Sequence, residues 1–407
     1  MTTISNKLLR ERASQFVSYV QEVRGYLHEN PEVSGREYET SSFLQKELNG
    51  MGLPVQRVSE TGLLAVLETG RPGPTVALRA DIDALPMSES PDNLLFAKKF
   101  VSKRQGVAHT CGHDGHMAML LGAARVLCQS KDSISGRVLF CFEEGEETGS
   151  GIGGMMQALS QYDVSAVWGI HLTSFMETGT ISVDPGPRMA GETQVHFEVL
   201  GKGGHGSRPD LSINPVFAAA HVLTALGSAW PNRIDANETV TLGIATINGG
   251  TAPNIIPDHV KISGTLRFFN VREGAKAVEV LKHVATHAAK AHMCDVRFDD
   301  NAFRIGPPVI NDAELSEFAA RCLRDVLPAG AVVSQDKWYA SESFRNYGAS
   351  YPAVLAFVGA RNLQQGMGAE HHNVHFDIDE GALELGLLAT VKFATEMLGA
   401  GEVQERE

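Results

Sequence analysis

Helix and strand patterns alternate along the first 172 residues, and this alternation constrains the fold more than any other feature of the chain. Apolar residues recur at helical spacing near 7–29, 38–51 and 116–130, whereas short apolar runs at 75–81, 137–142 and 166–172 are typical of buried strands. Connecting helices place successive strands side by side and parallel. This order therefore predicts an α/β domain built on a mostly parallel sheet.

The pattern changes near residue 190. Strands are expected at 192–204, 239–250, 259–269 and just after 294, with helices at 213–230 and 272–292. This β-α-β-β-α-β order predicts a ferredoxin-like antiparallel sheet with helices on one face. Helix, strand and helix follow at 312–327, 353–360 and 380–399. We therefore expect an α/β domain of residues 1–190 and 305–407, with an α+β domain of residues 191–304 inserted into it, and a length of 407 residues also favours two domains.

Composition excludes several classes of protein. The formal net charge is −13 and Lys and Arg form no runs, which argues against nucleic-acid binding, because phosphate recognition needs clustered basic residues. The N-terminal segment lacks the apolar core of a signal peptide, and no stretch approaches the ~18 apolar residues of a membrane span. The 5 cysteines are scattered, unlike those of a disulfide-stapled secreted domain. We therefore expect a cytoplasmic protein without membrane contact.

The segment HTCGHDGHMAM (109–119) concentrates a thiol, three imidazoles and a carboxylate, all of which need partners once buried. Cys111 and His113 lie two residues apart, so in an extended segment they point the same way and can bind one metal ion or a close pair. Asp114 either caps the following helix or orients a metal-binding imidazole. A helix start with solvated histidines is the alternative, but this density of ligands favours a metal site.

A second segment, EEGEETGSG (143–151), carries four carboxylates in five positions. The ordinary interpretation of such a run is a solvated acidic loop. Adjacent residues such as Glu146 and Glu147, however, project to different sides. One can then bind a metal ion while the other acts as general base toward the water that the ion holds.

Polar residues follow each predicted strand of the α/β domain. Asp81 and Asp83 follow the apolar part of 75–81, Glu146 and Glu147 follow 137–142, and His171 lies at the end of 166–172. His371 and His372 follow 353–360 at a loop's length. Because the loops beyond the carboxyl ends of parallel strands form the binding crevice, these residues are expected to converge on one site.

The inserted domain adds His205, Asn254 and Arg267, each of which taken singly is more often structural than catalytic. At this point the chain resembles a known family: the metal-dependent amidohydrolases and peptidases that include aminoacylases, hippurate hydrolase and plant auxin-conjugate hydrolases. Five segments match it in order and span nearly the whole chain: LRADIDALPM (78–87), HTCGHDGHMAMLLGAA (109–124), GGHGSRP (203–209), NIIPD (254–258) and HHNVHFDIDE (371–380).

The resemblance implies a catalytic domain with a two-metal site and an inserted lid domain that often mediates dimerisation. On matching positions, it implies a general base at Glu146, an oxyanion-stabilising lid residue at His205 and substrate contacts at Asn254 and Arg267. The metal ligands that it implies are Cys111, His113, Glu147, His171 and His372.

The chain departs from the family pattern at three places. The usual Phe-Gln-Pro-Ala-Glu-Glu is FEEGEE (142–147), which adds Glu143 and Glu144 as rival carboxylates. The usual Ser-Glu-Asp-Phe is SESF (341–344), with Ser343 where the acid is expected. His371 beside His372 makes the last ligand ambiguous by one residue.

The resemblance and the residues together predict an amidohydrolase that cleaves the amide bond of an N-acyl amino acid with a water activated by one or two divalent ions. Zinc suits the thiolate, manganese suits the carboxylates and imidazoles, and cobalt or nickel also fit. A dipeptidase or exopeptidase with the same site is the alternative, and a catalytically silent metal-binding scaffold is a further one. A small-molecule substrate and a homodimer formed through the lid domain are expected.

Overall fold

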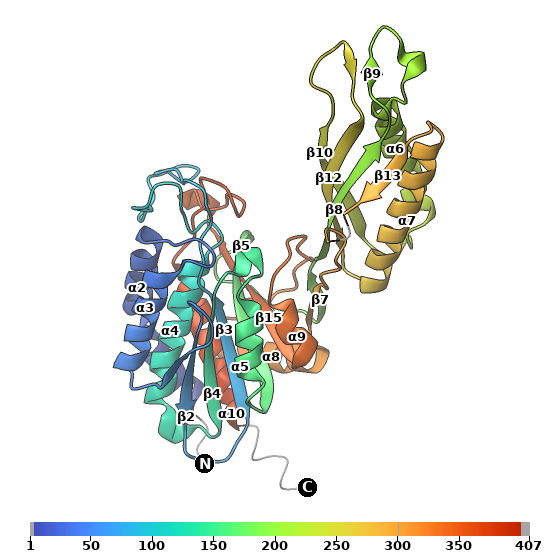
Figure 1. Cartoon of the computed structure of the whole chain (residues 1–407). Coiled ribbons are helices and arrows are strands. Elements are labelled where there is room, and N and C mark those ends of the chain that lie inside the picture. The colour runs from blue at the N-terminus through green and yellow to red at the C-terminus, as the bar shows by residue number, and fades with distance from the viewer. Residues whose placement is uncertain (1–3, 300, 400–407) are drawn as a thin grey trace. The chain divides into compact units, whose positions relative to one another are not determined.

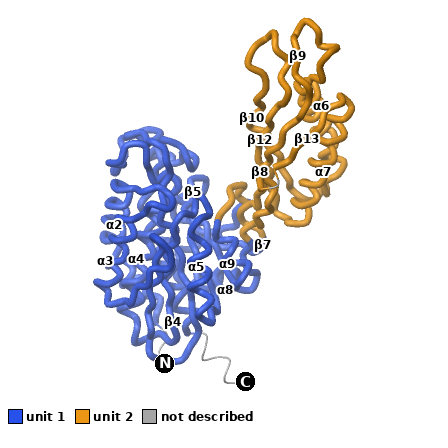
Figure 2. Tube along the Cα trace, viewed as in Figure 1, with its two compact units in different colours: residues 1–186, 310–336, 343–407 blue, residues 187–309, 337–342 orange. Residues whose placement is uncertain are grey.

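The structure is a computed structural model, and it describes residues 4–299 and 301–399 (Figure 1). The chain divides into two compact units. Unit 1 comprises residues 1–186, 310–336 and 343–407, and unit 2 comprises residues 187–309 and 337–342 (Figure 2). The assignment of a catalytic and a lid domain, with limits at 190 and 305, stays a prediction.

Unit 1 is built on a seven-stranded sheet of order β1-β2-β4-β3-β5-β15-β6. Its four central strands, β4, β3, β5 and β15, run parallel, and the strands toward either edge pair antiparallel. This confirms the predicted α/β fold. The strands are β1 (Val55–Arg57), β2 (Leu63–Glu68), β3 (Thr75–Asp81), β4 (Arg137–Glu143), β5 (Val164–Glu177), β6 (Ile181–Ser182) and β15 (Ala353–Arg361).

Helices cover both faces of this sheet, and Figure 1 shows α4 and α5 on opposite sides of it. Every residue of β3 is buried, as expected for a parallel strand between two helical layers. Helices α4 and α10 both contact β3 and β5. The helices are α1 (Asn6–Gln15), α2 (Val17–Glu29), α3 (Tyr38–Gly50), α4 (His113–Gln129), α5 (Ile152–Leu159), α8 (Ala313–Val326), α9 (Arg345–Ser350) and α10 (Gly381–Gly399).

Unit 2 contains an antiparallel sheet of order β10-β12-β8-β13 and two helices that contact each other and the sheet. Alternate residues of β8, such as Val195, Phe197 and Val199, point into the core, so one face is apolar. The predicted order of six elements is present. They are β8 (Gly191–Leu200), α6 (Pro215–Ala229), β10 (Val240–Asn248), β12 (His259–Phe268), α7 (Val271–Lys290) and β13 (Asp295–Phe298).

The structure corrects the bounds of two expected helices and adds two strands that were not expected. The helix expected at 7–29 is interrupted at Phe16, whose ψ of 3° ends α1 before α2 begins. The helix expected from residue 116 already begins at His113. The strands β1 and β2 were not predicted, because β1 is only three residues long and largely exposed and β2 carries almost no alternation. Within 4–299 and 301–399, no helix is long and apolar enough to cross a membrane.

Candidate metal centre

The residues predicted to bind metal meet at the carboxyl ends of the parallel strands of unit 1. Cys111 precedes α4, and His113 is the first residue of that helix. Glu147 lies in a one-turn 3-10 helix (Glu146–Thr148) that follows β4. His171 lies within β5, and His372 lies in the segment between β15 and α10.

Ligand atoms of these five residues form two overlapping groups. In each group, all three ligand atoms lie within 4.8 Å of one another. One group is Cys111, His113 and His171, and the other is Cys111, Glu147 and His372. Because Cys111 belongs to both, its sulfur lies between two sets of ligands that suit divalent metals.

Hydrogen bonds determine which nitrogen of each imidazole faces the cluster. His113 Nδ1 lies 2.9 Å from the Asp83 carbonyl oxygen and 3.2 Å from Asp83 Oδ1. His171 Nδ1 lies 2.7 Å from the Leu172 carbonyl oxygen. Since these oxygens accept, both Nδ1 atoms donate, and in the neutral ring Nε2 carries the lone pair. His171 Nε2 lies 3.8 Å from Cys111 Sγ. A hydrogen bond from Nδ1 to an oxygen, on the side of the ring away from the metal, is typical of metal-binding histidines.

Two buried atoms at the centre of the cluster lack hydrogen-bond partners within the described part of the chain. They are His113 Nε2 and Glu147 Oε1, which lie 3.9 Å apart. Leaving such atoms unsatisfied costs about 1–3 kcal/mol each, and a divalent cation between them would satisfy both. The residues therefore fit the metal that the resemblance implies.

Gly112 sets the geometry of the Cys-Gly-His sequence. Its φ of 89° lies in the left-handed region, which glycine enters at little cost. The chain thus turns between Cys111 and His113, and a helix begins. The expectation that these two side chains converge because the segment is extended is wrong, and a left-handed turn at a helix start brings them together instead.

Glu146 and Glu147 have different neighbours, as expected for adjacent residues. Glu147 Oε1 lies 3.2 Å from His372 Nε2. Glu146 Oε1 accepts a hydrogen bond of 2.9 Å from the Ser343 amide. A carboxylate oxygen of Glu146 also lies within 4.8 Å of ligand atoms of His113 and Glu147, so Glu146 adjoins the cluster.

Glu143 and Glu144, the other two carboxylates of this segment, form hydrogen bonds away from the cluster. Glu143 accepts hydrogen bonds from Arg79 Nε at 2.8 Å and from Ser343 Oγ at 2.5 Å. Glu144 Oε2 accepts from the amide and the hydroxyl of Thr61. Neither belongs to a group of candidate ligands among the described residues. The pairing of Arg79 with Glu143 was not predicted, because the sequence around Arg79 indicates only a buried strand.

His371 and His372 differ clearly in their surroundings. His371 Nε2 lies 2.9 Å from the Leu172 carbonyl oxygen, and its Nδ1 lies 3.4 Å from Ser174 Oγ. Burial lowers the pKa of His371 well below its usual value, and the nearby imidazole of His171 lowers it further. Of the two, His372 is the one that reaches the carboxylate of Glu147.

Two other members of the 109–119 segment have structural contacts. His116 Nδ1 donates to Asp81 Oδ1 at 2.7 Å, and its Nε2 accepts from the Leu172 amide at 2.9 Å, so both nitrogens are engaged. Asp114 does not cap α4, which begins one residue earlier, and its hydrogen-bond partners in the described part of the chain are Arg24 and His28 rather than candidate ligands. It accepts a 2.9 Å hydrogen bond from Arg24 Nε, because the first turn of α4 packs on α2.

Burial raises the pKa of the Cys111 thiol well above its usual value, and the carboxylate of Glu147 raises it further. His113 lowers the pKa of the Cys111 thiol, but by less than burial and Glu147 raise it. The thiol on its own is therefore protonated at neutral pH, and binding of a cation must displace that proton.

The predicted residues of unit 2 fall into two places. His205, in the short strand β9 (Gly204–His205), pairs with Ile255, next to Asn254. His205 Nδ1 lies 2.8 Å from Ser207 Oγ. Arg267 lies near the end of β12. At roughly 3.3 Å per residue, it is about 25 Å from His259, the first residue of that strand. There it forms a 3.0 Å ion pair with Glu192, so the structure does not bring Arg267 beside His205.

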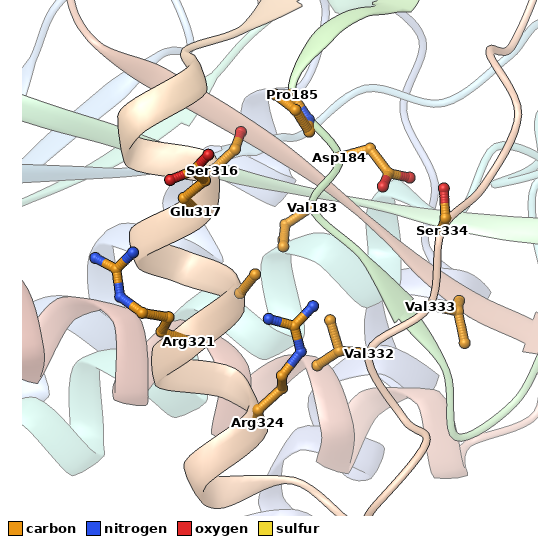
Figure 3. Close-up of a pocket in the computed structure, with 11 residues that line it drawn as sticks. Val183, Asp184, Pro185, Ser316, Glu317, Arg321, Arg324, Val332, Val333 and Ser334 are labelled. Carbon is orange, nitrogen blue, oxygen red and sulfur yellow. The ribbon is translucent and has the colours of Figure 1, made fainter.

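A separate pocket in unit 1, with a volume of about 400 Å³, contains none of the predicted site residues. Figure 3 shows Arg321 and Arg324 of α8 on one side of it and Asp184 on the other. The mixture of both charge signs around it indicates no particular ligand.

The sequence model of a protein family, peptidase family M20/M25/M40, matches residues 77–396 of this chain. The chain belongs to this family. Thermostable carboxypeptidase 2 of Saccharolobus solfataricus is 33% identical over 399 residues, which cover 95% of this chain and 98% of the relative. N-acyl-L-amino acid amidohydrolase of Geobacillus stearothermophilus is 37% identical over 291 residues, which cover 71% of this chain and 76% of the relative.

A solved structure of a dinuclear metal-binding peptidase of the M20 family from Bacillus subtilis is also similar. It is 29% identical, has a TM-score of 0.80 and covers 95% of this chain and 99% of that chain. These matches confirm the resemblance seen in the sequence. This M20 protein is an amide-cleaving hydrolase with candidate ligand groups for a divalent metal.

Proposed function

We propose that this M20 protein hydrolyses the amide bond of N-acyl amino acids. The observation that carries the proposal is the cluster around Cys111. There an imidazole nitrogen of His113 and a carboxylate oxygen of Glu147 are buried without hydrogen-bond partners among the described residues, and a second carboxylate lies beside them. The Geobacillus relative is named for this activity, which supports the substrate class.

One or two divalent cations would be held by Cys111, His113, Glu147, His171 and His372. Such ions, when bound, acidify a water molecule and polarise the scissile carbonyl. The thiolate favours zinc, and the remaining ligands also suit manganese, cobalt or nickel. Elemental analysis of the purified protein would identify the metal and its stoichiometry.

Glu146 is the general base of this proposal. It takes the proton of the attacking water and returns it to the nitrogen of the leaving amino acid, a role that typically contributes about 100-fold to 10,000-fold. The Ser343 amide holds Glu146 Oε1 at 2.9 Å and so orients the carboxylate beside Glu147.

Unit 2 would supply the remaining groups. His205 donates to the oxygen that becomes negative as the carbonyl is attacked, and Asn254 and Arg267 bind substrate. His205 belongs to a different unit from the cluster. We expect it to reach substrate by closure of unit 2, as a lid, or from a neighbouring subunit. Arg267 would have to leave Glu192 to bind a carboxylate of the substrate.

An exopeptidase with the same site is the second candidate, because the Saccharolobus relative is a carboxypeptidase. A panel of substrates separates the two. The metal-loaded protein is assayed on N-acetyl and N-benzoyl amino acids, on N-blocked dipeptides and on free dipeptides, with Glu146→Gln as control for contaminating hydrolases. Fastest turnover of the first group supports the proposal. Turnover confined to dipeptides supports an exopeptidase.

The predicted assembly and location belong to the same proposal. We expect a homodimer formed through unit 2, and light scattering after size exclusion would measure its mass. We also expect the protein to act in the cytoplasm on a small-molecule substrate, and cell fractionation would test that location.

A further inference from the structure

Glu143 is a fully buried carboxylate at the end of β4. Its Oε2 accepts hydrogen bonds from Arg79 Nε at 2.8 Å and from the Tyr347 hydroxyl at 2.9 Å. Its Oε1 accepts from Ser343 Oγ at 2.5 Å. Since charge-assisted hydrogen bonds are the strong ones, this carboxylate is the centre of a fixed network.

Ser343 lies between the carboxylate and the guanidinium. Arg79 Nη2 donates to Ser343 Oγ at 2.9 Å, while the hydroxyl proton points to Glu143. Arg79 also donates to Asp81 Oδ2 at 2.7 Å. A buried guanidinium is costly without paired negative charge, so Glu143 and Asp81 together make the burial of Arg79 tolerable.

The network reaches the cluster through the backbone. Ser343, whose hydroxyl is held on both sides, donates its amide hydrogen to Glu146 Oε1 at 2.9 Å. A shift of Ser343 would therefore shift the hydrogen bond that orients Glu146. A displacement of about 1 Å in an active site can cost about 100-fold in rate.

We propose that Glu143 and Ser343 are a coupled pair of positioning residues: Glu143 pairs with Arg79 and, through Ser343, holds Glu146 in place. This inference rests on the proposed role of Glu146 as general base. The pair contacts no substrate and acts only through Glu146.

A double-mutant cycle tests the coupling between Glu143 and Ser343. The four proteins are the wild type, Glu143→Gln, Ser343→Asp and the double variant. Glu143→Gln leaves Arg79 short of one carboxylate, and Ser343→Asp places a second carboxylate against Glu143. Each is expected to lower kcat by about 100-fold, with KM and metal content little changed. The double variant restores one carboxylate beside Arg79, and its kcat should lie within about tenfold of the wild type.

A matched control uses the neighbouring carboxylate. Glu144→Gln removes a charge bound to Thr61, outside the network, so Glu144→Gln should not rescue Ser343→Asp. Losses that simply multiply in the Glu143/Ser343 double variant would overturn the proposed coupling, and so would equal rescue by Glu144→Gln.

The stability of the same proteins separates this inference from the proposed function. If the wild type cleaves no N-acyl amino acid, the proposed function fails, and with it the role of the pair in positioning a catalytic base. The coupling between Glu143 and Ser343 is then decided by urea unfolding. Recovery of the unfolding midpoint in the double variant alone supports it, and additive losses overturn it.

Discussion

His372 Nε2 lies 3.2 Å from Glu147 Oε1, and His372 has a backbone φ of 60°. The left-handed conformation costs a non-glycine residue on the order of 1 kcal/mol. The His372 amide donates to the Thr110 carbonyl oxygen at 3.0 Å, which ties this strained residue to the segment that carries Cys111. Backbone strain of this kind persists where the surrounding structure enforces it, and it is common at functional sites.

Replacing His372 should therefore remove metal without unfolding the loop. His372→Asn keeps a residue that tolerates positive φ but shortens the side chain, so metal content and kcat/KM should both fall. His371→Asn is the matched control, because His371 contacts Leu172 and Ser174. It should keep metal and lower the thermal unfolding temperature. Loss of metal in the control alone would make His371 the ligand.

The adjacent glutamates should separate catalysis from metal binding. Glu146→Gln should retain near-normal metal and bind substrate, yet lose about 100-fold to 10,000-fold in kcat. Glu147→Gln should lose metal as well. Elemental analysis and steady-state kinetics of both variants measure these effects. The opposite pattern would exchange the two roles, and near-normal activity in both would place the chemistry on other residues.

Metal should protect Cys111 from alkylation. The thiolate is the reactive form, and burial holds the pKa of this thiol high, so labelling of the chelated protein should be slow at pH 7 and faster at pH 9. Protein reloaded with zinc should show little labelling at either pH. Mass spectrometry of the peptide that contains Cys111 gives the rates, and equal rates with and without metal would remove this residue from the ligand set.

His205 should affect turnover and leave metal unchanged. Loss of one oxyanion donor typically costs about 100-fold to 1000-fold in kcat, and His205→Ala is expected to fall in that range. His259→Ala is a suitable control, since His259 is a partly exposed histidine of unit 2, paired with Asp258. Parallel loss of metal in His205→Ala would instead identify this histidine as a ligand.

Asp114→Asn should destabilise unit 1. The carboxylate is paired with Arg24, and both side chains are at most 3% exposed, so removing the charge should cost about 3–5 kcal/mol. Burial alone would raise the pKa of Asp114, but Arg24 and His28 outweigh it and hold the pKa far below its usual value. This contribution is complete well above an unfolded-state pKa of about 3.9, and it fades as pH falls below that.

Urea unfolding of the chelated protein at pH 7 and near pH 3 measures this dependence. The difference between wild type and Asp114→Asn should be smaller at the lower pH. The exposed Arg208–Asp210 pair provides the control, because Asp210→Asn removes a carboxylate of the same type from a solvated ion pair and should change the midpoint very little.

Long periodic segments and strand ends made much of the fold predictable. The run at 75–81 and the run at 137–142 match β3 and β4 within one residue, because buried parallel strands are almost continuously apolar. The convergence of polar residues beyond those strands followed from the same topology. The interruption at Phe16 was not predictable, since helical periodicity continues across it.

The site was less predictable in its hydrogen bonds than in its composition. Which of Glu143, Glu146 and Glu147 faces the cluster depends on the left-handed turn at Gly145, whose φ is 59°. A pattern of residue types does not encode that direction. The partnership of Glu143 with Ser343 joins residues far apart in the chain, and spacing alone gives no indication of it.

The length of β5 has a consequence for how a metal ion could enter and leave. This strand continues to Glu177, well past His171, and at His171 it is paired in parallel with Phe357 of β15. The backbone that carries His171 can therefore move away only by breaking the sheet, which makes hydrogen exchange there slow. His372, with a side chain 50% exposed, lies instead on a segment outside the strands. Exchange of the ion with solvent should then proceed by release of His372 first, at a rate set by that segment rather than by the sheet.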